Sequence, residues 1–349
     1  MNLTVNKLPS LTWNHLKMNE TKVTVEGAFK NHSPKAEFDS SEVLWEKETA
    51  KVFPEFPGDL KALTAEASVS LAETAPGVTM ETPLVLSYAY EEGESGASRL
   101  LLHAGKKSHL KVLMVLSGNA SASAIETEIH GEEDSQVDLY VIELLGEKAL
   151  CLNHIAGTAQ KNAEINLIKL ELGGGKIYAG VNVDLRGADS RFHSETGYHV
   201  KPGQILDMNY LAVHEGKRTQ SLMEVNGTLE ETAKKIFRGT IDFRQGCAGA
   251  KATENENVML MADELQNQTI PVILCKEEDV EGNHGASIGQ LDEKVLFYLA
   301  SRGISREAAQ AMIAQARIDA ICEKIPVESV LQQVREFEGV RENTHGEEL

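Results

Sequence analysis

A cysteine and a histidine near residue 280 are the side chains of this sequence best suited to chemistry. Cys275 ends the aliphatic run "PVILC", and His284 follows it nine residues later. Four carboxylates lie between them: Glu277, Glu278, Asp279 and Glu281. A thiolate and an imidazole are both good ligands for iron, so the two residues form a candidate iron-binding pair. Because Asn283 and Gly285 are turn formers, we expect His284 to lie exposed in a turn.

These residues also have ordinary interpretations. A lone cysteine in an aliphatic strand is more often a small core residue, and a histidine in a turn can be a surface residue without a role. The histidines do not form a metal cluster by spacing, because Gly197 indicates a turn between His193 and His199. The four cysteines are widely separated and are expected to be reduced thiols: Cys151, Cys247, Cys275 and Cys322.

Composition excludes some classes of partner. The chain has 349 residues with 42% hydrophobic residues, enough for a large core. Lys and Arg total 34 against 53 Asp and Glu, and the net charge of −19 opposes contacts to phosphate. The N-terminus lacks a basic start followed by an apolar run, and no apolar stretch approaches the roughly 18 residues of a membrane span. We therefore expect a cytoplasmic protein that binds neither nucleic acid nor membrane.

Short aliphatic runs that end in glycine or acidic residues dominate the chain from about residue 86 to 289. No long helical pattern interrupts them, which argues against a doubly wound sheet and leaves a sandwich, a barrel or a solenoid. Aliphatic residues at alternating positions, as in "INLIKLEL", few aromatic residues and non-strand segments at both ends favour the solenoid. The sequence predicts a mainly β fold, with residues 1–85 as a mixed segment and 86–289 as stacked parallel strands.

Residues 290–349 have the pattern of a helical domain. A first helix is expected from about Asp292 to Arg302, with Gly303 as its C-terminal cap. Ser305 can cap a second helix, and a third follows Pro326. Helices this short must pack on the solenoid or on a partner.

The stretch "NHGASIGQLDEKVLFYLASRGISREAAQAMI" closely resembles the C-terminal region of the SufB/SufD family, the scaffold proteins of the SUF iron–sulfur cluster assembly system. The convincing match covers about residues 235–325. "LPSLTWNHLKMNE" looks like a SufD-type beginning. The resemblance implies a right-handed parallel β-helix followed by a helical C-terminal domain, and a scaffold rather than an enzyme.

The resemblance is closer to SufD than to SufB. SufB members have a glutamate where this chain has Gly285, and the SufB cysteine falls near Glu256, which is not a thiol. The resemblance implies that His284 faces the SufB cysteine across a heterodimer interface, where it is a possible transient ligand of the nascent cluster. Cys275 matches a strand cysteine of some members.

The resemblance also implies an ATPase partner. The family binds SufC, an ABC-type ATPase, through the region from about 290 to 325, where we expect part of an apolar set to remain exposed: Leu296, Tyr298, Met312 and Ile313. The family's complex can carry a reduced flavin, but this sequence has no dinucleotide fingerprint, so flavin binding is left open.

Two alternatives remain at the level of sequence. The first is a SufB-like homodimer that serves a reduced SUF system without a separate SufD. The second is a parallel β-helix enzyme acting on polysaccharides, which the missing signal peptide and the helical tail disfavour.

Overall fold

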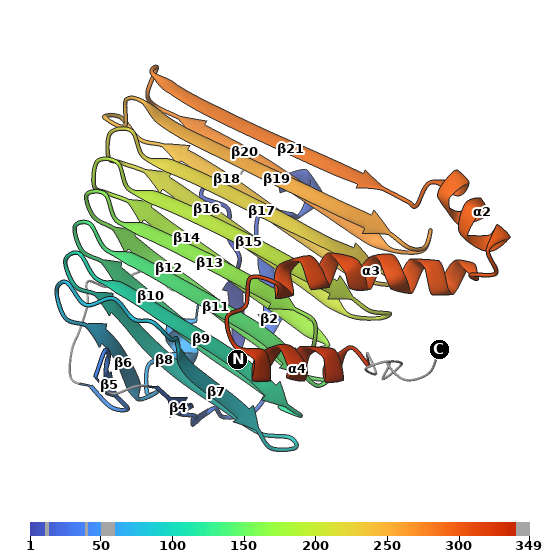
Figure 1. Cartoon of the computed structure of the whole chain (residues 1–349), viewed down its shortest axis with the longest axis horizontal. Helices are drawn as coiled ribbons and strands as arrows, with labels where there is room; N and C mark the ends of the chain where they lie inside the picture. The colour runs from blue at the N-terminus through green and yellow to red at the C-terminus, as the bar shows by residue number, and fades with distance from the viewer. Residues whose placement is uncertain (11–13, 39–40, 50–59, 340–349) are drawn as a thin grey trace, which may run out of the picture.

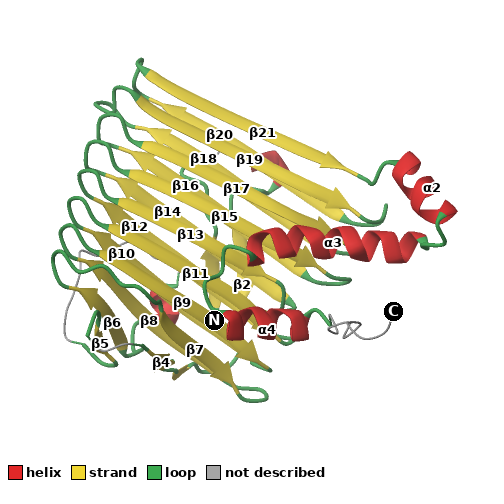
Figure 2. Cartoon of the chain, viewed as in Figure 1, coloured by secondary structure: helices red, strands yellow, loops and turns green. Residues whose placement is uncertain are grey.

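Two facing, largely parallel β-sheets form the body of the protein (Figure 1). The structure is a computed structural model and describes residues 1–10, 14–38, 41–49 and 60–339. Strands alternate between the sheets along the chain, so that each coil contributes one strand to each sheet. This is a parallel β-solenoid, and the predicted mainly β fold with C-terminal helices is confirmed (Figure 2).

The first sheet, called sheet I here, contains most of the even-numbered strands. Its order begins with the last strand of the sheet: β20 (Gln266–Cys275), β18 (Lys234–Phe243), β16 (Ile205–His214), β14 (Lys176–Leu185), β12 (Leu150–Ala159), β10 (Ala122–Gly131), β8 (Ser95–Ala104), β6 (Val69–Thr74) and β5 (Leu44–Glu46). The short β3 (Lys30–Asn31) also pairs with β8, and β5 is antiparallel to β6.

The second sheet, sheet II, faces sheet I. Its order is β21 (Val280–Gly289), β19 (Ala250–Leu260), β17 (Gln220–Leu229), β15 (Arg191–Val200), β13 (Glu164–Glu171), β11 (Gln136–Leu145), β9 (His109–Gly118), β7 (Leu84–Tyr90) and β4 (Lys35–Glu37). Strand β4 is antiparallel to β7. Because β6 and β7 already pair in parallel with the next coil, the sheets begin before residue 86, where the sequence pattern placed the start of the solenoid.

Side chains that point inward from the two sheets form one continuous core. Val112, Leu139 and Leu167 lie in register on three successive strands of sheet II, and each is almost completely buried. Such a stack forms because successive side chains of a strand point to opposite faces, so every second residue meets the same position of the next coil. The inward positions are not all apolar, however, because Lys169 and Glu171 of β13 also point inward and are buried.

The outer faces of both sheets are covered by the two ends of the chain. On sheet I lie the antiparallel strands β1 (Asn2–Val5) and β2 (Thr21–Thr24), together with α1 (Lys61–Thr64). A 3-10 turn, η1 (Asn14–Leu16), precedes β2. On sheet II lie α3 (Arg306–Cys322) and α4 (Glu328–Phe337), which cross the strands in Figure 1. Isoleucines of α3 and valines of α4 bury outward-facing leucines such as Leu170 and Leu172.

The predicted helix boundaries are confirmed. Helix α2 (Glu293–Ser301) is followed by Gly303, whose positive φ of 82° is a conformation that glycine adopts without strain. The Ser305 hydroxyl accepts a hydrogen bond from the Ala308 amide at 3.1 Å and caps α3. The last ten residues of the predicted helical domain, 340–349, lie outside the described residues. None of the described helices is long and apolar enough to cross a membrane.

The C-terminal end of the solenoid, unlike its two outer faces, is left uncovered by the described residues. Strands β20 and β21 are the last strands of sheets I and II, and the chain then leaves the stack through α2 (Figure 1). Within the described ranges, no further strand pairs with their outer edges. We call this last coil, β20 and β21, the open end.

Candidate interface at the open end

His284 lies in the middle of β21, and the prediction that it sits in a turn is wrong. Asn283 and Gly285 extend with it because β21 forms a continuous parallel ladder with β19, in which His284 is in register with Glu254. The ladder satisfies the backbone hydrogen bonds of these residues on one side, so their preference for turns is overridden. The predicted exposure of His284 is confirmed.

The register also shows which face of the sheet carries His284. Glu254 is buried inside the solenoid, so His284 belongs to the inward-facing column of side chains. It is exposed because no further coil of the described residues covers it. Ile288 is on the same face, in register with the buried Val258, and remains 46% exposed. The open end therefore presents an uncovered section of the solenoid interior.

Cys275 ends β20 on the opposite sheet and is also on the inward face, in register with the buried Phe243. The interpretation of Cys275 as a small core residue is wrong, because it is exposed. Its thiol donates a hydrogen bond to the Glu277 carbonyl oxygen at 3.0 Å. All four cysteines are free thiols, as predicted.

The two predicted site residues share the open end but are not brought together. A side chain at Gly282 would contact Ile273 across the interior, so Cys275 lies closer to the connecting turn than His284 does. Among the hydrogen bonds of the described chain, none joins the two side chains. Cys275 and His284 therefore cannot form a metal site within one chain without rearrangement.

Charged side chains fill the interior directly beneath the open end. Lys235 pairs with Glu256, and Thr269 donates to the second oxygen of Glu256 at 2.6 Å. Burial lowers the pKa of Lys235, although Glu256 opposes the shift. Burial and the neighbouring Glu256 raise the pKa of Glu254 to about 8, and one oxygen of Glu254 has no hydrogen-bond partner. Sequence reasoning missed this cluster, because nothing in the run "ENENVML" shows that its glutamates point inward.

Helix α2 carries the most exposed apolar surface. Of the four residues predicted to contact an ATPase, Tyr298 and Met312 are each 57% exposed, and Ile313 is half-buried. Leu296 is buried, so of the expected set it is not among the residues that remain exposed. Phe297, at 77% exposed, was missed, although its position beside Leu296 in an amphipathic helix could have indicated it.

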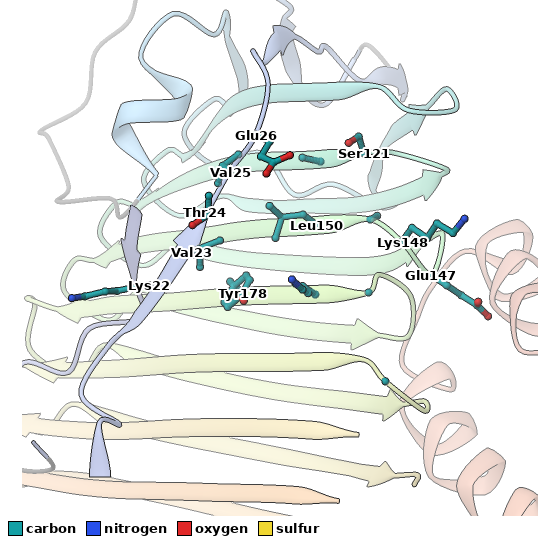
Figure 3. Close-up of a pocket in the computed structure, with 15 residues that line it drawn as sticks. Lys22, Val23, Thr24, Val25, Glu26, Ser121, Glu147, Lys148, Leu150 and Tyr178 are labelled. Carbon is teal, nitrogen blue, oxygen red and sulfur yellow. The ribbon is translucent and has the colours of Figure 1, made fainter. Parts of the chain in front are cut away.

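A groove of about 760 Å³ lies elsewhere, where β2 crosses the outer face of sheet I (Figure 3). Lys22 and Val23 of β2 line one side, and Leu150 and Tyr178 of sheet I line the other. None of the predicted site residues lies in it.

Strand β21 also contains a sequence pattern that can be mistaken for a catalytic site. Residues 285–289, "GASIG", match the G-x-S-x-G pattern of hydrolases. In those enzymes the serine sits on a sharp turn between a strand and a helix, whereas Ser287 lies within β21. The geometry of a nucleophile elbow is therefore absent at this serine.

The turn predicted at Gly197 is also wrong, because β15 runs without interruption from Arg191 to Val200. His193 and His199 consequently lie on the same outer face of sheet II, but each binds its own carboxylates. His199 contacts Glu230 and Glu338, at 2.7 and 2.9 Å. The two histidines form no common site.

A parallel solenoid whose last coil leaves its strand edges unpaired in the described residues has the architecture of a protein that can pair with another chain. Comparison with known proteins agrees with this class: the SufBD core domain of SUF system Fe–S cluster assembly proteins matches residues 88–317, about two thirds of the chain. The chain belongs to this family.

Its similarity to individual members is more limited. It is 29% identical over 122 residues to the iron-sulfur cluster assembly protein SufD of Bacillus subtilis, which is 35% of this chain and 28% of that protein. A SufBD family protein of Staphylococcus saprophyticus is 27% identical over 133 residues, 38% of this chain and 29% of its own length. The chain thus aligns with less than a third of the length of these relatives.

Proposed function

We propose that this chain is a SufD-like, cytoplasmic scaffold subunit of the SUF machinery. It pairs with a SufB-type subunit through its open end, so that a nascent iron–sulfur cluster forms at the subunit interface. Each subunit holds one SufC-type ATPase. No part of the proposal requires a flavin or a catalytic reaction by this chain.

The observation that carries the proposal is the uncovered last coil. Exposed edge strands are normally shielded, because their unpaired N–H and C=O groups pair readily with other strands. In the described part of the chain both last strands have an unpaired outer edge, and the inward face between them exposes Ile288 as well as the polar His284. A second solenoid end docked there would complete the β ladders and bury this face, as in β-strand addition.

His284 is the residue of the open end best suited to act on the cluster. Its imidazole can coordinate iron or hold a partner thiolate through a hydrogen bond, whereas alanine can do neither. Cys275 is the second candidate, because its thiol is exposed on the opposite strand of the same coil. When two chains meet at this face, both residues lie near the contact.

The second part of the proposal assigns the ATPase to the exposed side of α2 and the start of α3. Phe297 and Tyr298 of α2 and Met312 of α3 expose more than half of their surface. Large apolar side chains exposed in this way on neighbouring helices are expected at a protein contact site. The rest of α3 and all of α4 cover sheet II, so removing the whole helical region would also expose the solenoid.

The experiment is the His284→Ala variant, co-expressed with a SufB-type subunit and the ATPase. We expect the complex to assemble and cluster formation in cells to fall. Because the side chain fills no cavity, its removal should change the unfolding free energy by less than about 1 kcal/mol. The matched control is Asn283→Ala, whose side chain is on the outward face of the same strand.

Cluster formation at the wild-type level in the variant would refute the role of His284, and loss of folding would show that the residue is structural. The free edges at the open end can also pair with a second copy of this chain. A complex of two copies that assembles clusters without a SufB-type subunit would replace the heterodimer by the SufB-like homodimer.

A further inference from the structure

Three metal-ligating side chains meet on the outer face of sheet II, in the coils before the open end. His193 and Glu195 are two positions apart on β15, and Glu224 is in register with Glu195 on β17. One imidazole nitrogen and one oxygen from each carboxylate lie within 4.8 Å of one another. Because two adjacent strands hold the three backbones, the arrangement is built on rigid elements.

His193 differs from the two other histidines that lie between carboxylates. Both ring nitrogens of His103 face glutamates, at 2.9 and 3.1 Å, and both ring nitrogens of His199 do the same at 2.9 and 2.7 Å. When both ring nitrogens of a histidine donate hydrogen bonds to carboxylates, neither nitrogen has a free lone pair with which to bind a metal. The contact recorded for His193 is a single long one, from Nε2 to Glu224 at 3.4 Å.

Glu195 shows that this cluster already attracts a cation. Its side chain is nearly buried, and Lys324, just beyond the end of α3, reaches across to donate a hydrogen bond to it. A buried carboxylate requires such compensation. The single ammonium group faces two carboxylates, so the cluster keeps a net charge of about −1 while His193 is neutral.

The geometry points to a binding site for a divalent first-row transition metal ion, with His193, Glu195 and Glu224 as its ligands. One nitrogen and two oxygens suit iron(II), manganese(II), cobalt(II) or zinc(II), whereas calcium and magnesium prefer oxygen alone. Bonds of about 2.1 Å place neighbouring ligand atoms roughly 3 to 4 Å apart. The ligand atoms of the three residues lie within 4.8 Å of one another, so they must approach slightly to reach that spacing. His193 and Glu224 have partly exposed side chains that can rotate to shorten these distances. Lys324 leaves Glu195 when the ion binds.

The test uses the untagged, reduced full-length chain titrated with cobalt(II) without oxygen, because the visible absorption of cobalt(II) reports its ligands. We expect one site whose affinity falls about tenfold or more in His193→Ala and in Glu224→Gln. Lys324→Met should strengthen binding several-fold, since it removes the competing ammonium group. This gain separates a metal site from a purely structural ion pair.

The matched control is His109→Ala, which removes another histidine–carboxylate pair from sheet II, with 2.7 Å between His109 Nε2 and Asp138. It should leave cobalt binding unchanged. Equal losses in this control, an unchanged affinity in His193→Ala, or thiolate-to-cobalt charge-transfer bands would overturn the assignment. None of these measurements depends on a SUF partner, so they stand or fall separately from the scaffold role.

Discussion

The middle of the solenoid and its open end are built from the same kind of strand, yet their surroundings are opposite. In the middle, the chain termini cover both outer faces and the neighbouring coils cover both edges. At the open end, every residue of β21 except Val280 is exposed. The middle is thus specified by its own packing, whereas the last coil keeps backbone edges and side chains available for another molecule.

Ion pairs show the same contrast. Arg238 and Asp207, on adjacent strands of sheet I, are almost completely buried, with Nη1 and Oδ1 2.5 Å apart. Arg238 also donates to the Met18 carbonyl at 2.7 Å, and Asp207 accepts from Asn6 at 2.7 Å, so the pair fastens the N-terminal segment to the sheet. At the edge of the open end, Glu281 of β21 and Lys251 of the adjacent β19 are 2.6 Å apart but more than 60% exposed.

The largest expected effect comes from breaking the buried pair. Arg238→Met leaves Asp207 without its cation and releases the Met18 carbonyl, so the free energy of unfolding should fall by about 3 to 5 kcal/mol. Urea unfolding followed by circular dichroism measures it. Lys251→Met, the control that removes the exposed ion pair with Glu281 of the open end, should cost less than about 0.5 kcal/mol. Similar losses in both variants would mean that the last coil is as tightly specified as the middle.

The contrast also separates what the sequence could predict from what it could not. Short aliphatic runs predicted the stacked strands, and Gly303 and Ser305 predicted the helix ends, because these are local signals. At the end of β13 the usual arrangement, apolar residues inside and polar residues outside, is reversed. Lys169 and Glu171 point inward, whereas Leu170 and the following Leu172 point outward. Only the helices that cover sheet II explain the outward leucines, and no local pattern contains that contact.

The prediction of the candidate site from the sequence was limited in the same way, because local signals could be recognised and long-range contacts could not. The residue types and spacing selected Cys275 and His284, and both lie at the open end. The turn predicted around His284 failed because a ladder with β19, about 30 residues earlier, extends residues that favour turns. The interior charges beneath the open end were missed because the strand register, which decides whether Glu254 and Glu256 point inward, is a property of the whole stack.

A smaller effect concerns the attachment of α4 to the covered face. Burial alone would lower the pKa of His199, but hydrogen bonds to Glu230 and Glu338 outweigh it and raise the pKa to about 9. Because the pKa is raised on folding, the stabilisation is complete below the unfolded value of about 6.5 and is lost as the pH rises through about 9. His199→Gln should therefore lower the unfolding free energy by about 2 to 3 kcal/mol at pH 6.

The measurement is urea unfolding of both proteins from pH 6 to pH 10, and the difference between them should shrink toward the alkaline end. The control is Glu328→Gln, which alters an exposed ion pair with Arg335 on the same helix and should have almost no effect at any pH. A difference that stayed constant over this range would show that His199 acts through packing rather than charge.

The smallest effect on stability is expected in α2, the helix that belongs to the open rather than the covered part of the molecule. Phe297 is 77% exposed, so Phe297→Ser should change the unfolding free energy by less than about 0.5 kcal/mol. Leu296→Ala, one residue away and buried, should cost roughly 2 kcal/mol or more. If the exposed side of α2 holds the ATPase, Phe297→Ser weakens co-purification with it although the chain remains as stable as the wild type. Wild-type retention of the ATPase would remove Phe297 from the contact, because a residue that neither stabilises the fold nor binds the partner has no remaining role in this surface.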